Sequence, residues 1–210
     1  MSMMHTESKV IHWARFYDLG TTLMGGRIRA LHRRLIERAA IAPGERVLDV
    51  GCGPGRLTLA AARAAGPGAA VGIDPSPEMI ALARGKAARA GIPATFRVAG
   101  IEAIPAPDAH FDVVLASLML HHLPDELQRR GLAEVFRVLA PNGRFVALDF
   151  SAMPGHGIGH LLSVLGLRRG SAHAEHLRAF ANDAGFASVE VTPESRVFSL
   201  LRASKPGPTH

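Results

Sequence analysis

Cysteine, long apolar runs and internal repeats are what this sequence has least of. A single Cys in 210 residues excludes an intramolecular disulfide and argues against a zinc cluster. No apolar run approaches the roughly 20 residues needed to cross a bilayer. The N-terminal stretch MSMMHTESKVIHWARFYD lacks the clean apolar segment and the small-residue cleavage site of a signal peptide. These absences predict an intracellular, cytoplasmic protein.

The overall composition is that of an ordinary globular chain. It is 48% hydrophobic and 20% charged, and its length suits one domain with a core of useful size. The net charge of +6 is compatible with an anionic partner such as lipid or nucleic acid. The excess of Arg over Lys and the abundance of Ala, Gly and Pro are equally typical of a GC-rich genome. We expect no nucleic-acid partner.

Short apolar runs alternate with helical segments through the first 150 residues. Strands are expected at 46–50, 69–74, 94–99, 111–117 and 144–150. Helices are expected to begin at Arg27, at Arg56, at Pro77 after a Ser76 cap, and at Pro124. Several strands are apolar on both faces, as a sheet covered by helices on both sides requires. The pattern predicts a doubly wound, mostly parallel α/β sheet.

The two ends of the chain depart from this alternation. Residues 1–26 have weak periodicity and are interpreted as an arm that ends in a Gly25-Gly26 hinge, with residues 27–210 forming the main domain. Residues 151–171 are interpreted as a small cap insertion with its own apolar helix. A helix over 173–184 and strands over 187–192 and 195–204 follow. The last two strands are expected to form an antiparallel pair that completes a seven-stranded sheet.

The stretch VLDVGCGPG, residues 47–55, combines an apolar run with three glycines. In doubly wound sheets ligands bind beyond the carboxyl ends of the strands, and the loop after the first strand is such a place. Gly51, Gly53 and Gly55 let a ligand approach the backbone, and the next helix offers free N–H groups. Asp74 ends the second strand, where a carboxylate accepts hydrogen bonds from ribose hydroxyls. A ribose-containing ligand is predicted.

The glycine spacing separates the two main ribose-containing ligands. A dinucleotide fingerprint reads G-x-G-x-x-G, whereas Gly51 to Gly55 reads G-x-G-x-G with Asp49 just before it. A negative charge there suits a ligand with an ammonium and a sulfonium better than it suits a pyrophosphate. The spacing therefore favours an adenosyl compound over NAD.

Four segments in order carry a family resemblance: VLDVGCGPG, GIDPSPEMI, FDVVLASLMLHHLPD and EVFRVLAPNGRFVALDF. From residue 46 to residue 150 the chain resembles class I S-adenosylmethionine-dependent methyltransferases, in particular the small-molecule branch with the ubiquinone/menaquinone-biosynthesis C-methyltransferases. The resemblance implies a Rossmann-like sheet and S-adenosylmethionine as cofactor. It does not name the methyl acceptor.

The resemblance also implies roles for individual residues. Asp49 and the loop glycines would hold the methionine end, Asp74 the ribose, and Pro75 and Met79 the adenine border. An acid near the start of AGIEAIPAPD usually binds the adenine amine, but Gly100 stands at that position, and Glu102 is the candidate replacement. The full set of implied cofactor-binding residues is Asp49, Gly51, Gly53, Asp74, Pro75, Met79, Gly100, Ile101, Glu102, Ser117 and Leu118.

The acceptor side rests on fewer residues. His121 is a candidate general base, with a turn role ahead of the Pro124 helix as the alternative. Tyr17, in the arm, is a candidate lid residue over the site. His121 and His122 are adjacent and point in different directions, so no metal is expected. Cys52 is interpreted as a packing residue inside the glycine loop.

The sequence therefore predicts transfer of the methyl group of S-adenosylmethionine to a small acceptor by in-line displacement. The apolar segment 158–167 is compatible with a lipophilic acceptor or with contact to lipid. The arginine-rich helix that begins at Arg27 could dock weakly on an anionic membrane surface, or it could be a solvated face. Two other classes stay open: an NAD-dependent oxidoreductase, and an S-adenosylmethionine-binding protein without catalysis.

Overall fold

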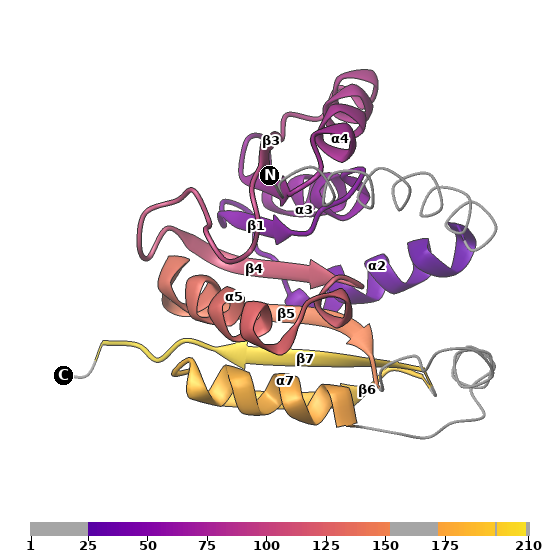
Figure 1. The fold of residues 1–210 in the computed structure, drawn as a ribbon. Helices are drawn as coiled ribbons and strands as arrows, with labels where there is room; N and C mark the ends of the chain where they lie inside the picture. The colour runs from indigo at the N-terminus through magenta and orange to yellow at the C-terminus, as the bar shows by residue number, and fades with distance from the viewer. Residues whose placement is uncertain (1–24, 152–171, 196, 209–210) are drawn as a thin grey trace, which may run out of the picture.

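The structure is a computed structural model that describes residues 25–151, 172–195 and 197–208 (Figure 1). The arm predicted at the N-terminus, which contains Tyr17, lies outside the described residues except for its last two positions. The cap predicted after Phe150 lies outside them beyond Ser151.

A seven-stranded sheet forms the centre of the molecule, in the order β3-β2-β1-β4-β5-β7-β6. The strands are β1 (Val47–Val50), β2 (Ala70–Asp74), β3 (Thr95–Val98), β4 (Phe111–Ser117), β5 (Leu139–Phe150), β6 (Ser188–Pro193) and β7 (Phe198–Ser204). Strands β1 to β5 are parallel, and β7 is antiparallel to both β5 and β6. The doubly wound sheet with an antiparallel closing pair is confirmed.

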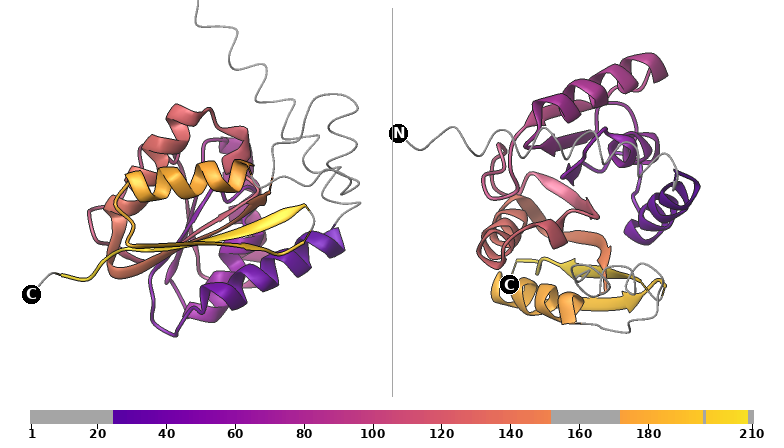
Figure 2. Two further views of the ribbon diagram at one scale, coloured as in Figure 1. Left: turned by 90° about the horizontal axis from the view of Figure 1, so that it is seen from below. Right: turned by 45° about the vertical axis from the view of Figure 1, so that its right-hand side comes forward.

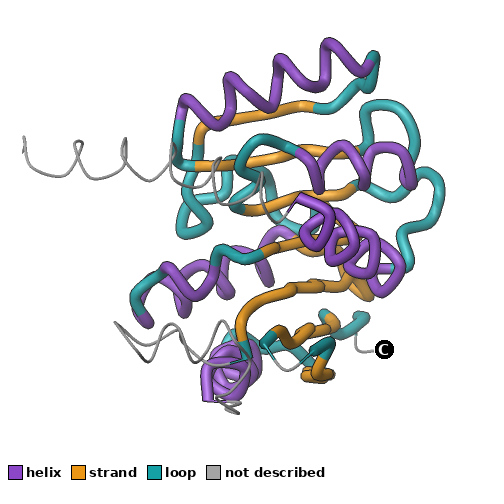
Figure 3. Tube along the Cα trace, turned by 90° about the vertical axis from the view of Figure 1, so that its right-hand side faces the viewer, coloured by secondary structure: helices purple, strands orange, loops and turns teal. Residues whose placement is uncertain are grey.

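Helices cover both faces of this sheet. They are α2 (Gly25–Ala39), α3 (Arg56–Ala65), α4 (Pro77–Ala90), α5 (Asp125–Val138) and α7 (Ala172–Asp183), with a short 3-10 helix η1 (Leu120–His122). Figure 2 shows α2 on one side of the sheet and α5 and α7 on the other. Figure 3 gives the same layers from the side. Along β5, Phe145 and Ala147 belong to the apolar cluster of α5 and α7, whereas Val146 and Leu148 belong to that of α2 and α3.

The start of α4 shows how the sequence sets an element boundary. The Ser76 hydroxyl accepts a hydrogen bond from the Met79 N–H at 3.2 Å, and Pro77 occupies the first helical position. The helix ends at Gly91, whose φ of 62° is a left-handed conformation that glycine adopts without strain. The predicted cap and start of this helix are confirmed.

Most boundaries lie within three residues of prediction, and two of the differences have a physical reason. Helix α2 begins at Gly25 rather than Arg27, so the predicted Gly25-Gly26 hinge forms its first turn, where the N–H groups have no intrahelical acceptor in any case. Strand β5 begins at Leu139 rather than Arg144. The intervening segment contains Asn142 with a φ of 63° and a shift in register against β4, so it is an irregular start of the strand. Its Pro-Asn-Gly composition is typical of a turn, which is why the sequence did not indicate a strand.

The parallel strands bring five loops to one edge of the sheet. Val50 of β1 is paired with Ile73 and with Ala116, so the ends of β2 and β4 lie on either side of the glycine loop. Asp74 is in turn paired with Val98 at the end of β3. The loops that carry the predicted site residues therefore meet along this edge.

Candidate active site

The three loop glycines differ in what a side chain at each position would meet. All three have positive φ, 65° at Gly51, 50° at Gly53 and 77° at Gly55, which disfavours other residues. A Cβ at Gly51 would lie 2.7 Å from Met119 Cγ, and one at Gly55 would lie 2.9 Å from the Phe96 ring. A Cβ at Gly53 would meet no atom of the described chain within 4 Å. Gly53 is therefore the position where the backbone faces open space that a ligand can enter.

Asp74 joins the end of β2 to this loop. Its Oδ2 accepts a hydrogen bond from the Gly53 N–H at 2.9 Å, and its Oδ1 accepts one from the Ser76 N–H at 2.9 Å. Burial raises the pKa of this carboxyl. Each carboxylate oxygen has a second lone pair, so both remain able to accept a ribose hydroxyl. Met79, in the first turn of α4, is buried, whereas Pro75 is exposed.

The end of β4 combines an unpartnered hydroxyl with a strained backbone. Ser117 is 9% exposed, and its Oγ has no hydrogen-bond partner among the described residues. The next residue, Leu118, has a φ of 55°, and its N–H donates to the Leu148 carbonyl at 2.8 Å. A buried polar atom without a partner indicates a ligand or water, and left-handed non-glycine residues cluster at functional sites. The predicted pair lies beside the glycine loop.

His121 forms a buried pair with an acid that the sequence reasoning missed. Its Nδ1 lies 2.5 Å from Oδ1 of Asp149, in β5, and both side chains are almost fully buried. The other carboxylate oxygen, Oδ2, accepts hydrogen bonds from the backbone N–H groups of Leu120 at 2.8 Å and His121 at 3.2 Å. A carboxylate can only accept, so it selects the imidazole tautomer with the proton on Nδ1 and leaves the lone pair on Nε2.

The loop after β3 holds the other predicted adenine-side residues. Ile101 is 4% exposed and packs in the core near Gly131. Gly100 and Glu102 stand on either side of it, and the Glu102 carboxylate folds back over Gly100. The structure therefore brings the residues implied for the cofactor to the ends of β1, β2, β3 and β4.

These residues can be compared with known proteins now that their arrangement is clear. Residues 47–143 match the family model described as a methyltransferase domain. The chain carries a class I S-adenosylmethionine-dependent methyltransferase domain. S-adenosylmethionine is the methyl donor of this family, which decides against the NAD alternative. The open face at Gly53, the acceptor oxygens of Asp74 and the unpartnered Ser117 hydroxyl fit such a ligand.

Several curated relatives share this methyltransferase domain. A demethylmenaquinone methyltransferase of Thermus thermophilus is 35% identical over 68% of this chain and 64% of its own length. A ubiquinone/menaquinone biosynthesis C-methyltransferase UbiE of Geobacter sulfurreducens is 40% identical over 65% and 54%. An arsenite methyltransferase of Halobacterium salinarum is 34% identical over 74% and 41%. The chain thus spans about half the length of these relatives.

Solved structures show the same fold at lower identity. A SAM-dependent methyltransferase from Aquifex aeolicus has a TM-score of 0.67 at 20% identity, with 82% of this chain and 88% of that chain covered. The [4+2]-cyclase SpnF has a TM-score of 0.68 at 21% identity, with 85% and 82% covered. A cyclase among such neighbours illustrates that the fold alone does not determine the reaction.

Asp49 of the methyltransferase domain lies beneath the glycine loop. It is 1% exposed, and its Oδ2 accepts a hydrogen bond from the Thr58 hydroxyl of α3 at 2.6 Å. Burial raises the pKa of the Asp49 carboxyl to about 7. Its protein partner is therefore Thr58, and its hold on the methionine end of the cofactor stays a prediction.

Cys52 of the same loop is buried. Its Sγ packs against Gly72 of β2, where an added Cβ would lie only 3.0 Å away. Burial raises the pKa of its thiol, so the thiol stays protonated at neutral pH. The packing role expected from the sequence agrees with this environment. No group of three His, Cys, Asp or Glu side chains within the described ranges could hold a metal ion.

The basic face of α2 is partly neutralised by contacts within the methyltransferase domain. Arg34 and Arg38 form ion pairs with Glu194, in the turn after β6, at 3.8 and 3.2 Å, and Arg33 pairs with Glu37 at 3.7 Å. Among the helices that the structure describes, none is long and apolar enough to cross a membrane. These ion pairs reduce the charge that α2 could offer to an anionic surface.

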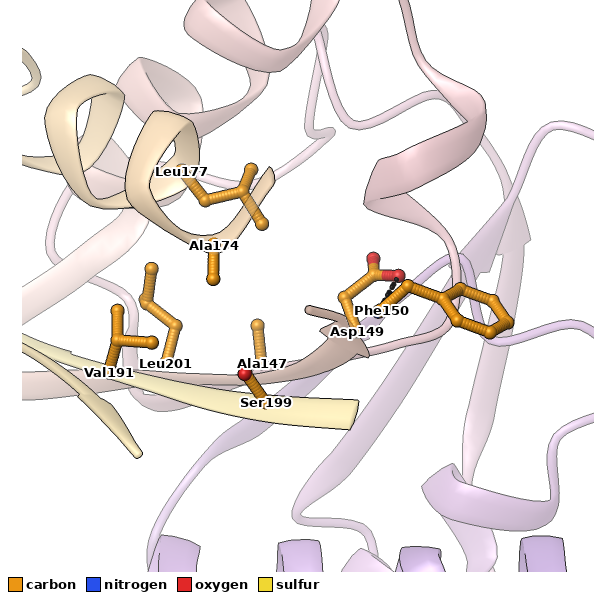
Figure 4. Close-up of a pocket in the computed structure, with 8 residues that line it drawn as sticks. All are labelled: Ala147, Asp149, Phe150, Ala174, Leu177, Val191, Ser199 and Leu201. Atoms are coloured by element: carbon orange, nitrogen blue, oxygen red, sulfur yellow. Dashed lines mark hydrogen bonds between the residues drawn. The ribbon is translucent and has the colours of Figure 1, made fainter. Parts of the chain in front are cut away.

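A narrow cavity lined in part by Asp149 lies between α7 and the sheet. Figure 4 shows Ala174 and Leu177 of α7 on one side and Ala147 and Leu201 of the strands on the other. The Phe150 ring points away from these side chains and makes a T-shaped contact with the His121 ring, with centroids 4.7 Å apart. The lining of this cavity is mostly apolar, and it borders the Asp149 member of the pair.

Proposed function

We propose that this protein transfers the methyl group of S-adenosylmethionine to a small lipophilic acceptor by in-line displacement, with His121 as the group that accepts the acceptor's proton. The observation that carries the proposal is the His121–Asp149 pair, an oriented imidazole in η1, which follows the predicted cofactor residues Ser117 and Leu118 along the chain. When bound, S-adenosylmethionine supplies an activated methyl group on a sulfonium, and the protein has to align the acceptor, exclude water and take up a proton.

The pair is built to take up that proton. The Nε2 lone pair of His121 accepts a proton from an acceptor hydroxyl or acidic C–H. The electron pair left on the acceptor forms the new bond to the methyl carbon as the methyl–sulfur bond breaks, and its electrons leave with the sulfur of S-adenosylhomocysteine. The resulting imidazolium is stabilised by Asp149, whose carboxylate is held in place by the N–H groups of Leu120, His121 and Phe150. Asp149 orients the base and does not itself touch the acceptor in this mechanism.

The surroundings of the pair support a lipophilic acceptor. Phe150 contacts the imidazole ring, and Ala174 and Leu177 line an apolar cavity that also borders Asp149. Two of the relatives are named for quinone methylation, and a ring with a hydrocarbon tail would suit such a surface. Arsenite is a thiophilic acceptor, and the single cysteine of this chain, Cys52, is buried in the glycine loop with a raised thiol pKa. The residues present therefore favour the first class of acceptor over the second.

The test uses defined acceptors and two readouts. Formation of S-adenosylhomocysteine is measured with hydroquinones and hydroxynaphthoquinones that carry or lack an isoprenoid tail, and S-adenosylhomocysteine affinity is measured by calorimetry. His121→Gln should lower turnover by about 10²–10⁴-fold with nearly unchanged affinity, and Asp149→Asn should act in the same direction. His110→Gln, at the position just before β4, is the matched control.

The same experiment can contradict each half of the proposal. Unchanged turnover in the His121→Gln variant would remove the imidazole from the mechanism. A preference for tail-less acceptors would contradict the lipophilic class. Tight S-adenosylhomocysteine binding without turnover on any acceptor of the panel would favour a binding protein without catalysis.

A further inference from the structure

The first turn of α7 lies beside the carboxyl end of β5. The Ala174 N–H donates to the carbonyl of Ser151, two residues beyond Asp149, with the nitrogen and oxygen 3.5 Å apart. Ala174 and Asp149 also line the same cavity (Figure 4). The start of α7 is therefore next to the Asp149 member of the buried His121–Asp149 pair.

His173, in this first turn, is buried with an unsatisfied nitrogen. The residue is 4% exposed, and its Nε2 has no hydrogen-bond partner among the described residues. Buried polar atoms are nearly always paired in native proteins, because an unpaired one destabilises the fold. An unpaired imidazole nitrogen at this place indicates a ligand or water.

Three other buried side-chain atoms in the described ranges lack a hydrogen bond, and two of them have a structural explanation. Glu194 Oε1 takes part in an ion pair with an arginine of α2, and Gln128 Oε1 belongs to an amide whose nitrogen donates to two backbone carbonyls. The third is the Ser117 hydroxyl, at the end of β4, and Ser117 is paired with the residue before Asp149 in β5. The two atoms left without an explanation, on Ser117 and His173, thus both lie around Asp149.

Asp149 is not free to be the partner of His173. Its Oδ1 accepts hydrogen bonds from His121 Nδ1 and the Phe150 N–H, and its Oδ2 accepts them from the N–H groups of Leu120 and His121. These four hydrogen bonds use the lone pairs of the carboxylate. His173 is close enough to Asp149 and His121 to interact with both electrostatically, but burial lowers its pKa below the usual 6.5. The His173 ring is therefore neutral at pH 7.

A neutral imidazole determines what kind of group can be its partner. Its nitrogen pairs with a hydroxyl or carbonyl oxygen, and the ring has no charge with which to attract a carboxylate or phosphate. His121 belongs to η1 and His173 to α7, so the two rings approach Asp149 from different elements. An acceptor that gives its proton to His121 can therefore present a second oxygen to His173 while its apolar body lies against Phe150.

We propose that His173 Nε2 forms a hydrogen bond with a second oxygen of the methyl acceptor, so that the site selects acceptors that carry an oxygen besides the group that gives up its proton. This inference rests on the proposed function for the existence of an acceptor site beside His121. It does not require His121 to be the base, because acceptor binding can be measured without turnover.

The test measures the binding of two probes to the complex with S-adenosylhomocysteine, which has no methyl group to transfer. Calorimetry gives the Kd of naphthalene-1,4-diol, kept under nitrogen, and of 1-naphthol, which lacks the second hydroxyl. The unmodified protein should bind the diol about 5- to 20-fold more tightly, with a factor of two from its two equivalent hydroxyls and the rest from one hydrogen bond between neutral groups. His173→Leu should leave only the factor of two, with the Kd of 1-naphthol unchanged.

Two further variants separate a direct contact from a structural effect. His173→Gln should keep most of the preference for the diol, because its amide can donate or accept at a similar distance from the backbone. His176→Leu, at an exposed position one turn further along α7, is the matched control and should leave both Kd values unchanged. The melting temperature of the His173→Leu protein should not fall, because Nε2 makes no hydrogen bond within the described chain that the change would remove.

A fourth variant distinguishes this inference from the proposed function. His121→Gln should weaken the binding of both probes alike and keep their ratio, whereas its turnover tests the base. Unchanged turnover in this variant, with the diol preference lost only in His173→Leu, would remove the base and leave the role of His173 intact.

An unchanged diol preference in the His173→Leu protein would overturn the inference. Equal losses for both probes, or a lowered melting temperature in both His173 variants, would do the same, because they would indicate a structural histidine. Failure of the unmodified complex to bind either probe, or to prefer the diol by more than the factor of two, would show that the site does not select a second oxygen.

Discussion

Replacing Asp49 by Asn should remove a pH dependence from the stability of the ligand-free protein. The folded state raises the pKa of this carboxyl from 3.8 to about 7, chiefly because it is buried. Between about pH 4 and pH 7 the folded protein holds a proton that the unfolded chain has released. The stability that this proton represents is complete below the unfolded pKa and is lost as the pH rises toward the folded pKa.

The magnitude follows from the size of the shift. One pKa unit corresponds to about 1.4 kcal/mol, so a shift of about three units corresponds to about 4 kcal/mol over the whole range. Asp49 is 1% exposed, so solvent screening does not reduce this figure much. An Asn does not titrate. From pH 5 to pH 8 the variant should gain about 2–3 kcal/mol of unfolding free energy relative to the unmodified protein.

Urea denaturation of the ligand-free protein at four values between pH 5 and pH 8 measures this directly. Asp183→Asn, the same change at an exposed position of α7, is the control. Thr58→Val is a second probe: the Thr58 hydroxyl lowers the pKa of Asp49, so its removal should move the loss of stability to higher pH. Parallel stability curves for Asp49→Asn and the unmodified protein would refute the reasoning.

Other predictions concern the ligand and the fold. Asp74→Ala should weaken S-adenosylhomocysteine binding by about 1.5–3 kcal/mol in calorimetry, and unchanged affinity in a folded variant would place the ribose elsewhere. Gly53→Val should abolish that binding, because a side chain would fill the open face and the φ of 50° disfavours Val, whereas Cys52→Ser should be nearly silent in the same titration. Lys205→Met should lower the melting temperature, because Lys205 Nζ donates to the carbonyls of Phe136 and Leu139 at 2.7 Å and the variant leaves them without this donor; an unchanged value would mean that water replaces it.

The sequence predicted the sheet because its strands are short apolar runs in an alternating order, and those runs are local. It predicted the cofactor edge because the loop glycines and Asp74 directly follow such strands. The His121–Asp149 pair spans 28 positions, and only the parallel pairing of β4 and β5 brings its members together. Asp149, an acid near the end of the fifth predicted strand, was the one signal in the sequence, but it did not indicate that His121 is its partner.

Gly100 illustrates a second kind of limit. The sequence shows a glycine followed two positions later by a glutamate, and that spacing has no fixed geometry in a loop. The fold-back of Glu102 depends on Ile101 being buried and on the Ala99–Asp74 hydrogen bond, both of which require the assembled sheet. Periodicity reports which face of an element is buried, but it does not report where a loop side chain turns.

The carboxylates near the carboxyl ends of the parallel strands differ in their hydrogen-bond partners within the protein. These partners determine how much of the site each substitution would disturb. Asp49 is bound by Thr58 inside the core, Asp74 by two backbone N–H groups, and Asp149 by backbone N–H groups and an imidazole. Those partners hold the loops that surround a ligand, so removing any of the three carboxylates also removes hydrogen bonds within the site. Glu102 has no such partner in the described chain. Its removal would therefore leave the hydrogen bonds of these loops in place.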